Sequence, residues 1–183
     1  MSMHDDVQEI LFTEQQLKQR VAELGAAISR DYAGREPVLL VSVLRGSYIF
    51  MADLSRAIDI PVQIDFMSVS SYGKGTSTSG QVEIKKDLSD SIEGKDLIIV
   101  EDILDSGNTL AFLKEYFMTK GAASITIVTL LDKPSRRTKA ITADLAGFTV
   151  PDEFVVGYGL DYCQQYRNVP YIGVLKPEVY ENH

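Results

Sequence analysis

Residues 97–110 read LIIVEDILDSGNTL, and this stretch decides which kind of fold the chain adopts. Its first four residues are continuously apolar, which is typical of a strand buried on both faces of a sheet. Two acids follow at once, and a helical pattern then runs from about residue 109 to 120 before Gly121. A further strand is predicted at 125–131. Strand, helix and strand in this order predict an α/β fold with a parallel sheet and crossover helices.

The same kinds of pattern continue toward the N-terminus. Apolar residues recur at spacings of three and four along residues 10–31, which predicts an amphipathic helix, and Thr13 with Gln16 matches a capping box at its start. Residues 38–43 form a short apolar run that predicts another buried strand. A helical pattern returns over residues 49–57.

Other strand-sized segments complete the chain. Strands are predicted at 62–69 and 82–86, and shorter apolar pieces lie at 154–156 and 171–175. The sequence contains no internal repeat and no linker-like stretch. We therefore expect a single domain that spans residues 1–183.

The composition is that of a soluble globular protein. The 183 residues are 45% hydrophobic and 24% charged, which argues against disorder. The N-terminus is acidic and is not followed by an apolar segment, and the longest apolar runs are too short to cross a bilayer. The only cysteine, Cys163, excludes an intrachain disulfide and a cysteine-rich zinc site, and we expect its thiol to be buried. These features predict a cytoplasmic protein without membrane contact.

The net charge restricts the partners. Nucleic-acid binding proteins displace counterions with basic surface, whereas this chain has a formal net charge of −8. We expect no nucleic-acid partner. Any phosphate that the protein binds should belong to a small molecule held by backbone amides and a metal ion.

The acidic loop after residue 100 suggests such a site. Ligands of parallel α/β sheets bind at the carboxyl ends of strands, and Gly107 lets the backbone approach a ligand at the start of a helix. Hydroxyls of Ser106 and Thr109 add donors to this phosphate cradle. The pair Glu101-Asp102 offers hard oxygen ligands that suit Mg²⁺.

Some of these acids have a simpler interpretation. Asp105 is also explained as a helix-start acid that the helix dipole favours. That explanation accounts poorly for Glu101 and Asp102, because both lie on the strand side of the loop.

Residues 68–80 read SVSSYGKGTSTSG and stand apart from the rest. The segment is too polar to pack in a core and too long for a tight turn. It is either a passive hairpin loop or a lid over an active site.

The stretch VEDILDSGNTL at 100–110 resembles the phosphoribosyl-diphosphate binding signature of the type I phosphoribosyltransferases. Other segments, over about residues 8–180, are similar to the branch of that family that acts on hypoxanthine and guanine. The resemblance implies an α/β fold with a central parallel sheet flanked by helices. It also implies a small hood over the C-terminal strand ends, to which residues 150–183 contribute. Residues 68–80 correspond to the family's mobile active-site loop, with Ser71 and Tyr72 as its Ser-Tyr pair.

The resemblance assigns roles for phosphoribosyl diphosphate. Glu101 and Asp102 would hold the ribose hydroxyls and Mg²⁺, with Asp161 near the metal. Arg45 and Gly46 match a short diphosphate loop, where the family often has Lys and a strained peptide bond. The 5′-phosphate would be wrapped by the remaining loop residues, which are Asp105, Ser106, Gly107, Asn108, Thr109 and Leu110.

The resemblance also assigns roles for the purine base. Asp105 would be the general base that acts on N7, which is chemically reasonable for a positioned carboxylate. Lys133 would donate to the 6-oxo group, and a lysine, which only donates, favours 6-oxopurines over adenine. Phe154 would stack on the base, Val155 would offer backbone groups to its edge, and Arg167 would reach the diphosphate. Arg136, Arg137 and Lys139 are interpreted as surface charge.

The implied activity is purine salvage, with transfer of the phosphoribosyl group to hypoxanthine or guanine. Two alternatives remain, namely xanthine preference and a non-catalytic nucleotide-sensing regulator of the same fold. A nucleotide-binding oxidoreductase is excluded, because no Gly-x-Gly-x-x-Gly follows a strand. The family also implies a homodimer or homotetramer.

Overall fold

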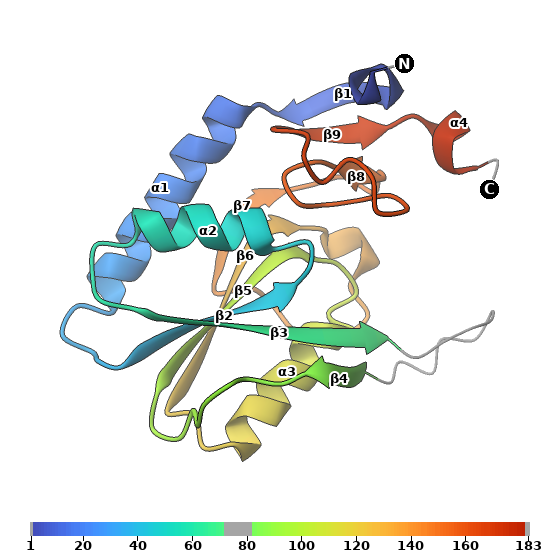
Figure 1. The fold of residues 1–183 in the computed structure, drawn as a ribbon. Helices are drawn as coiled ribbons and strands as arrows, with labels where there is room; N and C mark the ends of the chain where they lie inside the picture. Colours follow the sequence, from blue (N-terminus) through green and yellow to red (C-terminus); the bar gives the residue numbers. More distant parts are fainter. Residues whose placement is uncertain (1, 72–81, 182–183) are drawn as a thin grey trace.

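The computed structural model describes residues 2–71 and 82–181, and Figure 1 shows their arrangement. None of the helices in these ranges is long and apolar enough to span a membrane. The helices, including two 3₁₀ turns, are η1 (Met3–Asp6), α1 (Glu14–Asp31), α2 (Tyr48–Ala57), α3 (Asn108–Thr119), η2 (Pro134–Arg136) and α4 (Pro177–Tyr180). The strands are β1 (Val7–Phe12), β2 (Val38–Leu44), β3 (Gln63–Ser71), β4 (Val82–Lys86), β5 (Asp96–Leu104), β6 (Ser124–Asp132), β7 (Leu145–Thr149), β8 (Val155–Val156) and β9 (Ile172–Leu175).

A large sheet of six strands forms the centre of the fold, in the order β4-β3-β2-β5-β6-β7. All neighbouring strands from β3 to β7 are parallel, and β4 alone adds antiparallel at the edge. The predicted parallel sheet with flanking helices is therefore confirmed, with an antiparallel edge strand that the sequence patterns did not specify.

Side-chain alternation explains why the central strands are continuously apolar. In β2, Leu40 packs with α1 and α2, whereas Leu39 and Val41 pack on the α3 side. In β5, Ile98 and Ile99 divide between the same two faces. Figure 1 shows α3 on the opposite side of the sheet from α1 and α2. A strand covered by helices on both faces has no polar face to expose.

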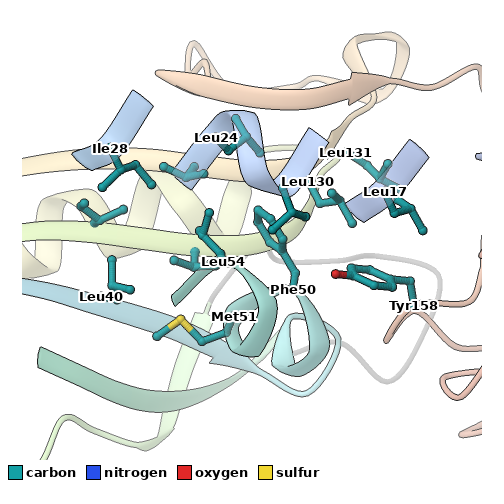
Figure 2. Packing of buried hydrophobic residues seen from close by; sticks show 14 of the residues in the cluster. Leu17, Leu24, Ile28, Leu40, Phe50, Met51, Leu54, Leu130, Leu131 and Tyr158 are labelled. Carbon is teal, nitrogen blue, oxygen red and sulfur yellow. The ribbon is translucent and has the colours of Figure 1, made fainter. Parts of the chain in front are cut away.

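The core between α1, α2 and the sheet is a continuous layer of large apolar side chains. Figure 2 shows Leu24 and Ile28 of α1 beside Phe50 and Leu54 of α2, all of them buried. The same cluster includes Leu130 and Leu131 of β6 and Tyr158 of the C-terminal region. One layer thus holds both helices to the sheet and reaches the C-terminal segment.

A second, small sheet has the strand order β1-β9-β8 and is called the hood below. Its strands pair antiparallel, with Ile10 opposite Gly173 and Val155 opposite Val174. Figure 1 shows the hood strands gathered apart from the large sheet, close to both ends of the chain. The hood therefore combines the C-terminal region with the N-terminal strand β1.

Three features differ from the sequence prediction. Residues 10–12 belong to β1 and not to the first helix, which begins at Glu14 after the Thr13–Gln16 capping box. Strand β5 runs three residues beyond its predicted end, to Leu104, and β7 was not predicted. Hydrogen bonds from neighbouring strands extend β5, because Ile103 and Leu104 pair with Leu131 and Asp132 of β6. Periodicity within one segment does not report such pairing.

The contact between α1 and α2 depends on Gly25. A Cβ atom at this position would lie 2.5 Å from the backbone oxygen of Ala57 and 2.6 Å from its Cβ. Alanine favours a helix over glycine by about 1 kcal/mol. Overpacking against backbone atoms that cannot rotate away costs about 1–3 kcal/mol. For Gly25→Ala this cost should exceed the gain in helix propensity.

We therefore expect Gly25→Ala to lower the melting temperature, by about 2–4 °C for each kcal/mol of net loss. Thermal denaturation followed by circular dichroism measures this. Ala26→Gly, at the exposed neighbouring position, is the control and should show only the ordinary propensity loss. A higher melting temperature for Gly25→Ala would contradict the close helix contact.

Candidate active site

The site residues gather where strand order changes direction in the large sheet. From β2 the chain crosses through α2 to β3 on one side, whereas β5 lies on the other side of β2. The parallel strands β2 and β5 therefore send their carboxyl ends to the same edge, at Leu44 and Leu104. Ligands of open α/β sheets bind at such switch points.

The loop after β2 contains Arg45 and Gly46 and leads into α2. The Leu44–Arg45 peptide bond is cis. Beneath the loop, the hydroxyls of Ser42 and Ser47 are buried and lie 2.7 Å apart, and that of Ser47 also donates to the carbonyl of Val43. These contacts tie the first turn of α2 to the end of β2.

Gly46 brings this loop against the acidic end of β5. A Cβ atom on Gly46 would lie 1.6 Å from Oδ2 of Asp102, so only glycine permits this approach. Strand alternation sends the neighbouring side chain, Glu101, to the other side, where it lines a cavity with residues of the phosphate cradle. The two adjacent acids thus face two different loops.

Both carboxylates are poorly compensated by protein groups. Burial, with a further contribution from the charge of Asp102, raises the pKa of Glu101 well above its usual range, and Glu101 Oε2 is buried and has no hydrogen-bond partner among the residues that the structure describes. Burial also raises the pKa of Asp102 from 3.8 to about 6, although the amide of Ile103 and the charge of Arg167 oppose the change. A buried, unpartnered carboxylate oxygen is suited to a cation, so this pair fits Mg²⁺.

Residues 105–110 form the predicted phosphate cradle at the start of α3. Gly107 has φ of +84°, and a Cβ there would lie 2.5 Å from Cγ2 of Ile141, so both conformation and space require glycine. The amide of Asn108 donates to Oγ of Ser106 at 3.3 Å. Thr109 and Leu110 belong to the first helical turn, whose amides have no intrahelical partner. A cavity of about 80 Å³ is lined by this loop and Glu101.

The C-terminal region supplies Asp161 and Arg167 beside the two loops. Arg167 donates to the carbonyl of Gly159 at 2.7 Å and forms an ion pair with Asp161 at 2.8 Å. Arg45 donates to Oε1 of Gln164 at 2.7 Å, so the loop after β2 is joined to this region. The structure thus brings the predicted diphosphate-binding residues together.

The residues predicted for the base lie between β6 and the hood. Lys133 is only 8% exposed, and its Nζ donates to the carbonyl of Glu153 at 2.7 Å. Phe154 is 36% exposed and contacts Tyr162 edge-on, at 5.5 Å between ring centroids. Val155 is buried in β8. Lys133, directly after β6, is thereby joined to Glu153, the neighbour of Phe154 directly before β8.

Some predictions receive a different outcome. Residues 68–71 of the predicted loop 68–80 belong instead to β3, where they pair with β4, because strand pairing outweighs their polar composition. The rest of the segment, with Tyr72, and the side chain of Ser71 lie outside the described residues. Among the described residues, no group of three or more His, Cys, Asp or Glu side chains is placed to hold a metal, and the role of Asp161 near the metal stays a prediction. Cys163 is exposed, which corrects the buried thiol, because it lies in a turn with φ of +49° and not in a packed strand.

One residue near the site was misjudged from the sequence. Arg137 is 15% exposed and donates to backbone carbonyls of the loop after β5, so it is not surface charge. Its local sequence has no apolar periodicity that would indicate burial. By contrast, Arg136 is 61% exposed and pairs with Asp152, as a surface charge does.

The burial of Asp102 has a consequence for stability. Because its pKa rises from 3.8 to about 6 on folding, its charge destabilises the folded protein above pH 6, and this effect disappears as the pH falls below 3.8. Without Mg²⁺, Asp102→Asn should therefore stabilise the protein at pH 8 by about 1–3 kcal/mol while impairing ligand binding.

The difference in the free energy of unfolding between Asp102→Asn and wild type should shrink as the pH falls from 8 to 4. Chemical denaturation with a chelator present measures this difference. Asp59→Asn, at an exposed position, provides the control and should show little pH-dependent difference. A variant that is less stable than wild type at pH 8 would argue against uncompensated burial.

Comparisons with known proteins agree with this geometry. The model of the phosphoribosyl transferase domain family matches residues 7–163. Hypoxanthine-guanine phosphoribosyltransferase of Bacillus subtilis is 54% identical over 98% of this chain and 99% of its own length. A crystal structure of a hypoxanthine phosphoribosyltransferase from Staphylococcus aureus superposes with a TM-score of 0.94 and 53% identity, covering 97% of this chain and 96% of that one.

Another relative is longer. The bifunctional protein TilS/HprT of Listeria innocua is 54% identical over 98% of this chain, which spans 28% of that protein's length. The family model and the relative of similar length both cover most of the chain. The chain therefore belongs to the phosphoribosyltransferase family, within its hypoxanthine-guanine group.

Proposed function

We propose that this chain transfers the 5-phosphoribosyl group from phosphoribosyl diphosphate to hypoxanthine or guanine, giving IMP or GMP and diphosphate. The observation that carries the proposal is the convergence of three elements at one sheet edge. These are the loop at Arg45-Gly46, the buried carboxylates Glu101 and Asp102, and the glycine-containing start of α3. A phosphorylated ribose with a diphosphate at its anomeric carbon has matching groups for all three.

The acidic pair supports a role for Mg²⁺ in this proposal. Glu101 and Asp102 would hold the ion together with the ribose hydroxyls, which agrees with the unpartnered Oε2 of Glu101. When bound, Mg²⁺ neutralises charge that develops on the leaving diphosphate. Arg45 and Arg167 add positive charge on the same side, and both are held by hydrogen bonds to residues 159–164.

The base would be held between Lys133 and Phe154. The Lys133 ammonium is anchored at the carbonyl of Glu153, one residue before Phe154, and retains donors for a 6-oxo group. Phe154 stacks on Tyr180, with 5.1 Å between the ring centroids, and the exposed part of its ring would stack on the base. Asp105 is exposed at the end of β5 and would accept the proton that the purine loses at N7 as its N9 bonds to the anomeric carbon.

The proposal also covers the domain organisation, partners, location and oligomeric state of the protein. We infer one domain, because β1 near the N-terminus pairs with β9 near the C-terminus. The net charge of −8 supports small-molecule partners over nucleic acid. A cytoplasmic location and a homodimer or homotetramer are proposed on the family resemblance.

A product assay tests the activity. Each of hypoxanthine, guanine, xanthine and adenine is incubated with phosphoribosyl diphosphate and Mg²⁺, and the nucleotide products are separated by chromatography. We expect IMP and GMP, and no AMP, since Lys133 only donates hydrogen bonds. Product formation should stop when a chelator removes Mg²⁺ and return when the ion is restored in excess.

Other outcomes are informative. Preferential formation of XMP would favour a xanthine enzyme, and no product from any base would favour a nucleotide-sensing regulator. Undiminished activity with the chelator would contradict the assignment of Glu101 and Asp102 to a metal.

A substitution tests the general base. Asp105→Asn keeps the size and hydrogen-bonding capacity of the side chain but cannot accept the purine proton. We expect kcat to fall by about 10²- to 10⁴-fold, as is usual for a lost general base, with GMP affinity nearly unchanged. Steady-state kinetics and GMP titration measure the two effects. Asp152→Asn, at an exposed acid outside residues 105–110, is the control. Turnover of Asp105→Asn at the wild-type rate would show that Asp105 is not the general base.

A further inference from the structure

The guanidinium of Arg137 binds groups at the ends of β5 and β6 and one carbonyl of its own segment. Its Nε donates to the carbonyl of Asp105 at 2.9 Å, and its Nη1 donates to that of Ile141 at 2.6 Å. Its Nη2 donates to the carbonyl of Leu104 at 3.2 Å and pairs with the carboxylate of Asp132. The side chain is 15% exposed, so these interactions are largely shielded from water.

The two residues after Arg137 donate hydrogen bonds to the next carbonyl along the loop, that of Ser106. The carbonyl of Ser106 accepts from the amides of Thr138 and Lys139 at 3.0 and 3.2 Å. It also accepts from the hydroxyl of Thr138 at 3.2 Å. Segment 137–141 therefore holds three consecutive carbonyls, those of residues 104, 105 and 106. We call this set of contacts the carbonyl clasp.

The clasp fixes the direction of the amides that follow. In a planar trans peptide the carbonyl oxygen and the next N–H point in opposite directions. Because the carbonyls of Asp105 and Ser106 face segment 137–141, the amides of Ser106 and Gly107 are directed away from it. Reversing either peptide would turn an electronegative carbonyl toward a bound phosphate, which would be repelled.

We propose that Arg137 is a positioning residue for the 5′-phosphate of the substrate and product. It acts through the backbone of the loop and has no contact with the phosphate itself. The proposal rests on the proposed function, with the 5′-phosphate bound at the start of α3 by the amides of residues 106–110. Preorganised amides bind an anion more tightly, because the loop does not have to be ordered when the ligand arrives.

The geometry of the clasp requires arginine rather than only positive charge. Its planar fork reaches three carbonyls in different directions while still pairing with Asp132. A lysine keeps the charge and the pair with Asp132 but presents a single point donor. Arg137→Lys should therefore fold, because Asp132 is not left unpaired, and yet lose the part of the clasp that holds the carbonyls of residues 104 and 105.

The experiment compares ligands that use different parts of the site. GMP is titrated calorimetrically into wild type, Arg137→Lys and Arg137→Gln, and Mg²⁺ with inorganic diphosphate serves as a ligand for the other loop. We expect both variants to raise Kd for GMP by about tenfold or more, the scale of losing charge-assisted hydrogen bonds. Kd for Mg²⁺-diphosphate should change by less than about twofold. KM for phosphoribosyl diphosphate should rise more than kcat falls, because the loop holds the phosphate before and during reaction.

Arg136→Gln is the matched control, since it removes the same charge from the neighbouring, exposed position. An equal effect of Arg136→Gln, or wild-type GMP affinity in Arg137→Lys, would reduce the role of Arg137 to charge and overturn the proposal. Equal losses for GMP and Mg²⁺-diphosphate would indicate general disruption of the site and overturn it as well. If wild type bound GMP no more tightly than guanosine, the assignment of residues 106–110 would itself be wrong, which is distinguishable from a failure of Arg137 alone.

Discussion

Two adjacent carboxylates follow the buried apolar part of β5, within the last four residues of that strand, and the loops around them are arranged about this charge. Glu101 and Asp102 are desolvated, and an oxygen of Glu101 has no protein partner. Burying charge is unfavourable unless a partner compensates it, and among the described residues Arg167 is the cation whose charge opposes the pKa shift of Asp102. The folded protein thus carries an electrostatic cost that the proposed cation would relieve, and ligand binding would then be linked to stability.

The loops around the two acids approach the site closely because glycines stand at the points of contact. Gly46 allows the backbone after β2 to reach the carboxylate of Asp102, and Gly107 adopts a backbone conformation that other residues rarely take. Glycine permits these positions but does not enforce them. Other contacts hold the loops in these conformations. They are the buried Ser42–Ser47 pair for the loop after β2 and the carbonyl clasp of segment 137–141 for the loop after β5.

The hood connects parts of the chain that are distant in sequence. Strand β1 precedes the first helix, yet it pairs with β9 beside β8. Tyr158 joins this region to α2 through a 2.5 Å hydrogen bond to Asp53, and Arg45 and Arg167 both contact Gln164. The base-side residues are therefore positioned relative to the phosphate-side residues by several independent contacts.

The sequence by itself determined the layers of the fold and the chemical character of the central loop. Short, doubly buried strands and an amphipathic α1 with its capping box follow from local periodicity, and an acidic pair before a glycine and a helix start indicates phosphate and metal. Local patterns did not reveal β1 and β7, the end of β5 at Leu104, or the exposure of Cys163. Only the tertiary structure decided these, because strand pairing depends on partners far away in the chain.

The same reason applies to Arg137, whose partners at residues 104 and 105 lie more than thirty residues earlier. A charged side chain in an irregular segment has no local signature of burial, and its role depends on which carbonyls the fold brings within its reach.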